Sequence, residues 1–231
     1  MPKHAIAYLR AGYVPKPLQP AFGEYFGMFE QLFAQYAPQL QLHCFDVQQG
    51  HYPQDMDAFA GFLICGSPSS VYDTEPWIEP LQAYIVRLHQ QQRKLVGICF
   101  GHQIIARALG GDVAKAPQGW GLGIQTTKLR PGHPLAQAKL HYSHQDQVLT
   151  PPTAAQTIAQ SAHCPHAMLR IGEHILTMQG HPEFSGAYCA ALIRSRQERL
   201  PAKQVEEALQ SLQQNNHNDA LAGWIGDFFT P

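Results

Sequence analysis

The stretch Leu95-Val96-Gly97-Ile98-Cys99-Phe100-Gly101 predicts a buried strand that turns abruptly into a helix. Its four leading residues form a short run of the kind found in parallel sheets that are covered on both faces. Beyond the turn, apolar residues recur at helical spacing as far as Leu109, and Gly110-Gly111 end the pattern. A cysteine between two glycines in this strand–turn–helix context is the pattern of a nucleophile elbow.

The residue types of this elbow have a physical reason. Such a turn holds its central residue in a strained backbone conformation, so its neighbours must be small, and here they are Gly97 and Gly101. Cys99 would lie at the carboxyl end of a strand, where open α/β sheets place their sites. It would also lie at the N-terminus of a helix, whose partial positive charge favours the reactive thiolate. We therefore predict that Cys99 is a nucleophile.

The rest of the chain predicts an α/β fold, because short apolar runs alternate with helical patterns. Strands are expected at residues 5–9, 40–47, 62–65 and 95–98, and antiparallel strands at 126–129, 140–143, 157–161, 167–171 and 175–178. Helices are expected around 26–36, 78–88, 104–109, 184–192, 205–212 and 221–228, with Asp73 or Thr74 as the cap of the second. The expected architecture has three layers: a mostly parallel central sheet flanked by helices, with a small antiparallel region.

Charge and composition exclude several kinds of partner. The chain has 16 Lys and Arg against 17 Asp and Glu, and it lacks the basic runs that nucleic acid or an anionic membrane surface would require. No stretch reaches the ~18 apolar residues of a membrane span, and residues 1–9 lack the pattern of a signal peptide. The five scattered cysteines imply no disulfide framework. We expect a soluble, cytoplasmic protein in which Cys44, Cys65, Cys164 and Cys189 are small core residues.

A base for the cysteine is suggested by His181-Pro182-Glu183, which follows the apolar run 175–178. A nucleophilic cysteine needs a base, and the base needs a group that orients it. If Pro182 keeps this segment extended, the side chains of His181 and Glu183 point the same way, and the carboxylate can fix the imidazole tautomer. Taken alone, the segment also fits an ordinary turn with a solvated glutamate.

Together, four motifs resemble those of the class I, or triad, glutamine amidotransferases, most of all stand-alone relatives of the GMP synthetase glutaminase domain. The family's nucleophile motif G-x-C-x-G-x-Q matches residues 97–103, and its downstream H-P-E matches residues 181–183. Residues 66–73 are similar to its oxyanion loop, and residues 143–148 to its S-H-G-D-x-V segment. The resemblance covers residues 4 to about 195 and implies one flavodoxin-like domain over 1–231, with C-terminal helices from about 196 to 231.

The resemblance implies a role for each matching position. Cys99 would attack the side-chain amide of glutamine and form a γ-glutamyl thioester, with His181 relaying protons and Glu183 orienting His181. The backbone N–H groups of Gly66 and Phe100 would form the oxyanion hole. The amino-acid end of the substrate would be held by Gln103, Ser143, Gln145 and Asp146.

Two departures from the family pattern leave alternatives open. Gln145 stands where many amidotransferase domains have glycine, and similar segments occur in stand-alone γ-glutamyl peptidases. The ATP pyrophosphatase loop of GMP synthetase is absent. The chain would then supply ammonia to a separate synthetase subunit, or hydrolyse γ-glutamyl compounds itself, or serve as a non-catalytic binding module. We expect no cofactor, and no metal because His141 and His144 lack a third ligand at suitable spacing.

Overall fold

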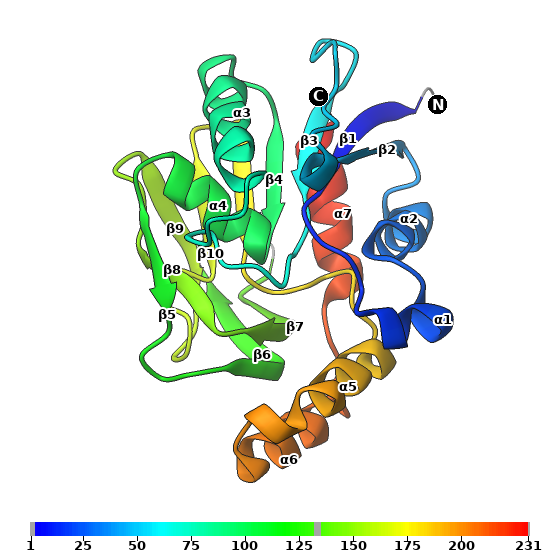
Figure 1. Cartoon of the computed structure of the whole chain (residues 1–231), viewed down its shortest axis with the longest axis vertical. Coiled ribbons are helices and arrows are strands. Elements are labelled where there is room, and N and C mark those ends of the chain that lie inside the picture. The colour runs from blue at the N-terminus through cyan, green and yellow to red at the C-terminus, as the bar shows by residue number, and fades with distance from the viewer. Residues whose placement is uncertain (1–2, 132–134, 231) are drawn as a thin grey trace.

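The computed structural model describes residues 3–131 and 135–230. Met1 and Pro2, which begin the segment tested above for a signal peptide, lie outside these ranges. Within them, the main sheet has nine strands in the order β2-β1-β3-β4-β11-β10-β9-β6-β7, and β5 pairs with β8 in a second sheet (Figure 1). The strands are β1 (His4–Arg10), β2 (Leu40–Asp46), β3 (Gly61–Ile64), β4 (Leu95–Ile98), β5 (Asp112–Lys115), β6 (Gly121–Leu129), β7 (Gln137–His144), β8 (Asp146–Thr150), β9 (Ala155–Gln160), β10 (Met168–Ile171) and β11 (Ile175–Met178).

The first half of the main sheet is parallel, as the apolar runs predict. Strands β2, β1, β3, β4 and β11 run in one direction, and every residue of β3, β4 and β11 is buried. Helices α3 and α4 pack together, as do α2 and α7, and Figure 1 shows the two pairs on opposite sides of these strands. The helices are α1 (Gln19–Phe22), α2 (Tyr25–Tyr36), α3 (Ile78–Gln90), α4 (Phe100–Ala108), α5 (Gly186–Ser195), α6 (Ala202–Ser211) and α7 (Asn218–Phe229). The predicted three-layer α/β fold is confirmed.

The second half of the sheet is antiparallel, with β6, β7, β9 and β10 at the expected positions. Strand β11, predicted among the antiparallel strands, pairs antiparallel with β10 but parallel with β4, so it joins the two halves. Strands β5 and β8 were not predicted, because their few apolar residues form neither a continuous run nor a long alternation. Helices α5 and α6 lie beside the ends of β6 and β7 (Figure 1).

Two local predictions are wrong. Helix α3 begins at Ile78 with Trp77 as its N-cap and no side-chain cap, whereas the Asp73 carboxylate accepts a hydrogen bond from Ser70 N at 2.7 Å within the preceding loop. Cys44 is exposed because it lies on β2, at the edge of the main sheet. The other three cysteines predicted as core residues are buried.

The C-terminal helices belong to the same globule. Helix α7 contributes Leu221, Ile225 and Phe229 to the main core, while α5 and α6 share a smaller cluster with Leu122 of β6. A short 3₁₀ helix, η3 (Gln197–Arg199), joins α5 to α6. None of the helices in the described ranges is both long and apolar enough to cross a bilayer.

Candidate active site

Cys99 lies on a strained turn between β4 and α4. Its backbone has φ 53° and ψ −101°, a conformation that a residue with a side chain rarely adopts. Strand β4 ends at the preceding residue and α4 begins at the following one, so the sulfur lies at the helix N-terminus. The residue is 6% exposed. The predicted elbow geometry is therefore present.

The two glycines of the elbow are required by close backbone contacts. A Cβ atom on Gly97 would lie 2.5 Å from the carbonyl oxygen of Gly101, and one on Gly101 would lie 2.2 Å from that of Ile64. Real Cβ atoms do not approach backbone oxygen this closely. The glycines thus allow α4 to fold back against β3 and β4 immediately after the cysteine.

His181 and Glu183 meet as the motif predicts, although the backbone between them differs. Imidazole Nδ1 of His181 lies 2.7 Å from carboxylate Oε1 of Glu183, and both side chains are buried. His181 forms an isolated antiparallel bridge with His141, and the chain turns at Pro182 instead of staying extended. The expectation of extended backbone is wrong, but the turn still directs both side chains to one place.

The surroundings of His181 favour its protonated form. Burial by itself lowers the pKa of this imidazole, but the Glu183 carboxylate together with Cys99 outweighs burial and raises the pKa to about 10. The Phe184 ring stacks on the imidazole at 3.8 Å between centroids and 9° between planes, which fixes the ring's orientation. At neutral pH, a positively charged imidazole therefore lies beside the cysteine.

Gly66 lies against both of these groups. A Cβ atom at this position would be 3.1 Å from Cε1 of His181 and 3.7 Å from Cβ of Cys99. Gly66 directly follows the buried Cys65 after β3, while Phe100 is the first residue of α4. The structure thus places both predicted oxyanion-hole residues next to Cys99.

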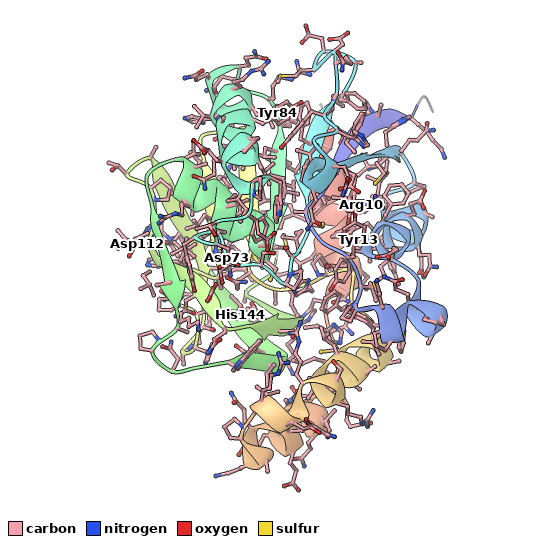
Figure 2. The ribbon with its side chains drawn as sticks, in the orientation of Figure 1. Arg10, Tyr13, Asp73, Tyr84, Asp112 and His144 are labelled. Carbon is pink, nitrogen blue, oxygen red and sulfur yellow. The ribbon has the colours of Figure 1, made fainter. Side chains whose placement is uncertain are left out.

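A cavity of about 420 Å³, here called the Cys99 cavity, opens beside the cysteine. It is lined by Ser67, Pro68, Ser69, Ser70, Cys99, Gln103, Lys115, Trp120, Ser143, His144, Gln145, Asp146, Arg196, Arg199 and Leu200. All four residues predicted to hold the amino-acid end of a substrate are among them. Two labels in Figure 2 help to find this cavity: His144 is the last residue of β7, and Asp73 lies in the loop after β3.

Two of the four predicted substrate residues, Gln103 and Asp146, already make hydrogen bonds within the protein. Gln103 Nε2 donates to the Asp146 carbonyl oxygen at 2.7 Å and to Gln179 Oε1 at 3.0 Å, which uses both amide hydrogens. Its carbonyl oxygen is the atom left for a ligand. The carboxylate of Asp146 accepts hydrogen bonds from the hydroxyl groups of Ser70 and Tyr72. The loop after β3 is thereby tied to the start of β8 across the cavity.

Sequence reasoning missed the basic side chains of the cavity. Lys115 ends β5, Arg196 follows α5 and Arg199 lies in η3, so none falls within the four recognised motifs. Trp120, to which the sequence assigned no role, lies 5.5 Å from the Arg196 guanidinium, measured to the ring centroid. Only the fold brings these positions together, and no local signal could have revealed them.

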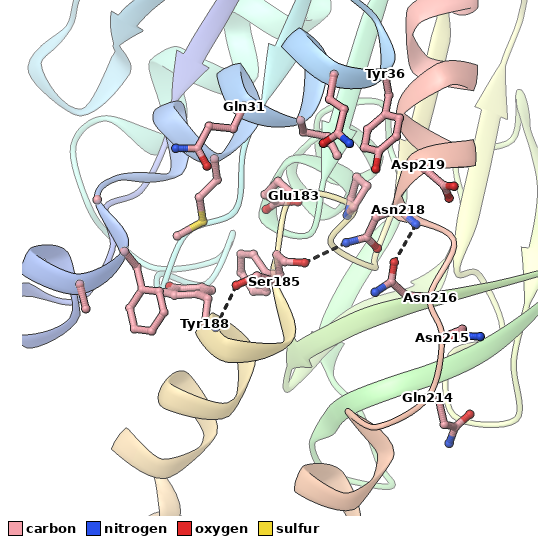
Figure 3. A pocket seen from close by; sticks show the side chains of 18 residues that line it. Gln31, Tyr36, Glu183, Ser185, Tyr188, Gln214, Asn215, Asn216, Asn218 and Asp219 are labelled. Carbon is pink, nitrogen blue, oxygen red and sulfur yellow. Dashed lines mark hydrogen bonds between the residues drawn. The ribbon is translucent and has the colours of Figure 1, made fainter.

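A second, wider groove of about 1020 Å³ adjoins Glu183 from the side of α2 and α7. Figure 3 shows its amide-rich lining, including Gln31, Asn216 and Asn218, and the Ser185 side chain that caps α5. The Asn218 side-chain nitrogen donates to the Phe184 carbonyl oxygen at 2.8 Å. This contact supports the turn that carries Glu183.

Two further buried histidines, His102 and His144, make structural contacts through Nδ1. His102 Nδ1 lies 2.7 Å from Thr177 Oγ1, linking α4 to β11, and His144 Nδ1 lies 2.8 Å from the Asp146 carbonyl oxygen. Burial lowers the pKa of His102 and of His144 to about 3 and that of His141 to about 4, so all three are neutral. In the part of the chain that the structure describes, no group of three His, Cys, Asp or Glu side chains is arranged to hold a metal ion.

Fold and site together define an α/β protein with a cysteine elbow and an adjoining His–Glu pair. The model of the glutamine amidotransferase class-I family matches residues 26–191, and the chain belongs to this family. It is 33% identical over 181 residues to gamma-glutamyl peptidase 3 of Arabidopsis thaliana, covering 73% of this chain and 72% of that protein. It is 30% identical over 128 residues to a glutamine-hydrolysing GMP synthase of Aeropyrum pernix, covering 54% of this chain and 24% of that protein. A glutamine amidotransferase of Thermotoga maritima shares the fold, with TM-score 0.76 and 16% identity over 97% of this chain and 96% of that one.

Proposed function

We propose that this protein hydrolyses γ-glutamyl amide bonds, with Cys99 as the nucleophile, His181 as the acid and base, and Glu183 as the residue that positions His181. The observation that carries the proposal is the 2.7 Å contact of His181 with Glu183 beside a cysteine on a strained elbow. A nucleophile, a base within reach and a group that orients the base are what covalent acyl transfer requires.

The reaction proceeds through a thioester. Sγ of Cys99 attacks the Cδ carbonyl carbon, and the C–N bond breaks as protonated His181 gives its proton to the leaving amine. This leaves a γ-glutamyl thioester on the sulfur and a neutral imidazole. Water then attacks the thioester, His181 accepts its proton, and glutamate leaves as the S–C bond breaks. The net change adds one water to the amide and gives glutamate and an amine, with no cofactor.

The developing oxyanion needs donors close to Cys99. The backbone N–H groups of Gly66 and Phe100 are proposed for this role, because both residues adjoin the cysteine. Removal of one such donor typically costs ~3–4 kcal/mol of transition-state stabilisation. The strain at Cys99 and the glycines around it hold the sulfur and these amides in a fixed relation.

For the substrate, we favour γ-glutamyl peptides over glutamine. The sequence alone put glutamine first, with γ-glutamyl compounds as the alternative. The Arabidopsis relative named a gamma-glutamyl peptidase and the departure at Gln145 support the alternative. Pockets of ~300–1,000 Å³ accommodate whole small-molecule ligands, so the Cys99 cavity of about 420 Å³ has room for more than glutamine.

Glutamine hydrolysis is the second candidate, in which ammonia passes to an acceptor on a separate synthetase subunit. The similarity to a GMP synthase supports this reading. Both candidates use the same acyl-enzyme and differ only in the leaving group.

All five cysteines are free, which supports the expected cytoplasmic, reducing environment for either candidate function.

Trapping the thioester with hydroxylamine tests the proposed function. Wild-type protein supplied with γ-glutamyl-alanine should release alanine and partition between glutamate and γ-glutamyl hydroxamate as hydroxylamine is added. Cys99→Ala should form neither product, whereas Cys44→Ala, at the exposed cysteine of β2, should match the wild type. Hydroxamate formation by Cys99→Ala, or no hydrolysis of γ-glutamyl-alanine or glutamine by the wild type, would contradict the proposal.

A further inference from the structure

Three basic side chains surround the Cys99 cavity: Lys115, Arg196 and Arg199. Among the described residues, the one carboxylate in its lining is that of Asp146, which accepts hydrogen bonds from two neighbouring hydroxyl groups. The chain as a whole has a net charge of −1. The excess of positive charge is therefore a property of the cavity and not of a generally basic protein, and it favours a ligand with more than one negative group.

The three cations are not equivalent. Arg196 is half-buried and fixed, because its Nη1 donates to Ser143 Oγ at 2.9 Å and its guanidinium lies over the Trp120 ring. Lys115 and Arg199 are exposed. Within the described ranges, neither of these two side chains has a hydrogen-bond or ion-pair partner in the protein. One positioned cation and two unpaired ones thus line the same cavity.

The charges of the possible substrates differ in a way that this arrangement can distinguish. The glutamyl part of any γ-glutamyl amide carries one α-carboxylate, which one fixed arginine can bind. When glutamine is the substrate, the leaving group is ammonia and brings no further negative charge. When the substrate is a γ-glutamyl amino acid or peptide, the leaving amine carries a carboxylate of its own.

We propose that Lys115 and Arg199 form a subsite for the carboxylate of the leaving amine. This inference rests on the proposed function and deepens it: the preferred substrates are γ-glutamyl amides whose amine part is an amino acid or peptide with a free carboxylate. Arg196 is left for the α-carboxylate of the glutamyl part. Because Lys115 and Arg199 come from different elements, β5 and η3, they can bind the carboxylate from two directions.

The test compares two substrates that differ only in this charge, γ-glutamyl-alanine and γ-glutamyl-alaninamide. The wild type should show a higher kcat/KM for the acid, and the ratio should fall as ionic strength rises because the two cations are exposed. Arg199→Gln and Lys115→Gln should each lower the acid-to-amide ratio about 3- to 30-fold, the range expected between a screened ion pair and a charged hydrogen bond. The double variant should bring the ratio close to one.

Arg194→Gln is the matched control, since Arg194 is exposed on the last turn of α5 and does not line the cavity. It should keep the wild-type ratio and the wild-type rate. An equal loss toward acid and amide in Arg199→Gln and Lys115→Gln, or an unchanged ratio in the double variant, would overturn the subsite and leave the proposed function standing. If the wild type hydrolyses neither substrate and also leaves glutamine intact, the proposed function fails and the subsite fails with it.

Discussion

The backbone N–H of Cys99 donates a 2.9 Å hydrogen bond to the carbonyl oxygen of Met178. This bond continues the parallel pairing of β4 with β11, in which Ile98 lies opposite Met178. It places the end of the strand that carries the cysteine beside the end of the strand that leads to His181. Cys99 and His181, which are 82 positions apart in the sequence, thus meet because the two short, buried strands that precede them are paired neighbours in the sheet.

The elbow glycines should be intolerant of alanine. Gly97→Ala and Gly101→Ala each force a Cβ into backbone oxygen, so the free energy of unfolding should fall by about 1–3 kcal/mol or more. Gly27→Ala is the matched control, because a Cβ there meets nothing within 4 Å and alanine favours the helix α2 by ~0.5–1 kcal/mol. Urea denaturation measures the free energy of unfolding of all three variants. Wild-type stability in Gly101→Ala would contradict the described packing.

Gly66→Ala should affect rate more than stability. Its φ lies outside the left-handed region, so alanine is compatible with the backbone, but the new Cβ would lie 3.1 Å from Cε1 of His181. Displacement of His181 or of the amide at position 66 should lower kcat about 10²-fold. The measurements are kcat for γ-glutamyl-alanine and thermal unfolding of the same preparation. An unchanged kcat would argue against an oxyanion hole at Gly66.

Glu183→Gln should lower the pH above which kcat/KM declines. In the proposed reaction, His181 must be protonated to release the amine. The nearby carboxylate is a main reason that the pKa of His181 is raised to about 10, against the lowering effect of burial. In the wild type, kcat/KM should therefore decline only as pH approaches 10. Without the charge of Glu183 the pKa of His181 falls, so the decline should begin at a lower pH, and the maximal rate should drop roughly 10²–10⁴-fold.

The control for this profile is Glu79→Gln, an exposed position in the first turn of α3. It should keep both the wild-type rate and the wild-type alkaline limit. An alkaline limit that stays in place in Glu183→Gln would show that this carboxylate does not set the protonation of His181.

Asp146 should act on the α-ammonium group of the substrate. Its carboxylate lines the Cys99 cavity, held by Ser70 and Tyr72. Asp146→Asn should lower kcat/KM for γ-glutamyl-alanine about 10–100-fold, as expected for a charged hydrogen bond, and should have much less effect on glutaryl-alanine, which lacks the amino group. Tyr72→Phe should produce a smaller loss of the same kind, and Tyr36→Phe, at an exposed tyrosine on α2, should have no effect. Equal losses for both substrates in Asp146→Asn would contradict this role.

The sequence predicted the structure well where backbone geometry depends on adjacent residues. The run at 95–98 and the glycines on either side of Cys99 form the predicted elbow. The side chains of His181 and Glu183 meet as predicted, although through a turn at Pro182 and not through extended backbone. The parallel strands could be predicted for the same reason, since full burial leaves a continuous apolar run.

Prediction failed at one competing local contact and at features that only distant segments decide. The cap of α3 was misplaced because Asp73 instead satisfies the N–H of Ser70 within its own loop. Cys44 is exposed because β2 ends the sheet, which no local pattern reveals. Lys115 and Arg199 reach the Cys99 cavity only through the placement of β5 and η3.

The assignment of Cys99 as the nucleophile of a site shaped for the γ-glutamyl group can be tested with 6-diazo-5-oxo-L-norleucine. This glutamine-shaped electrophile should give one covalent adduct, located on Cys99 by peptide mass spectrometry. Excess glutamine or γ-glutamyl-alanine should suppress it, and Cys99→Ala should not form it. An adduct on another residue, or no adduct while iodoacetamide still alkylates Cys99, would contradict this assignment.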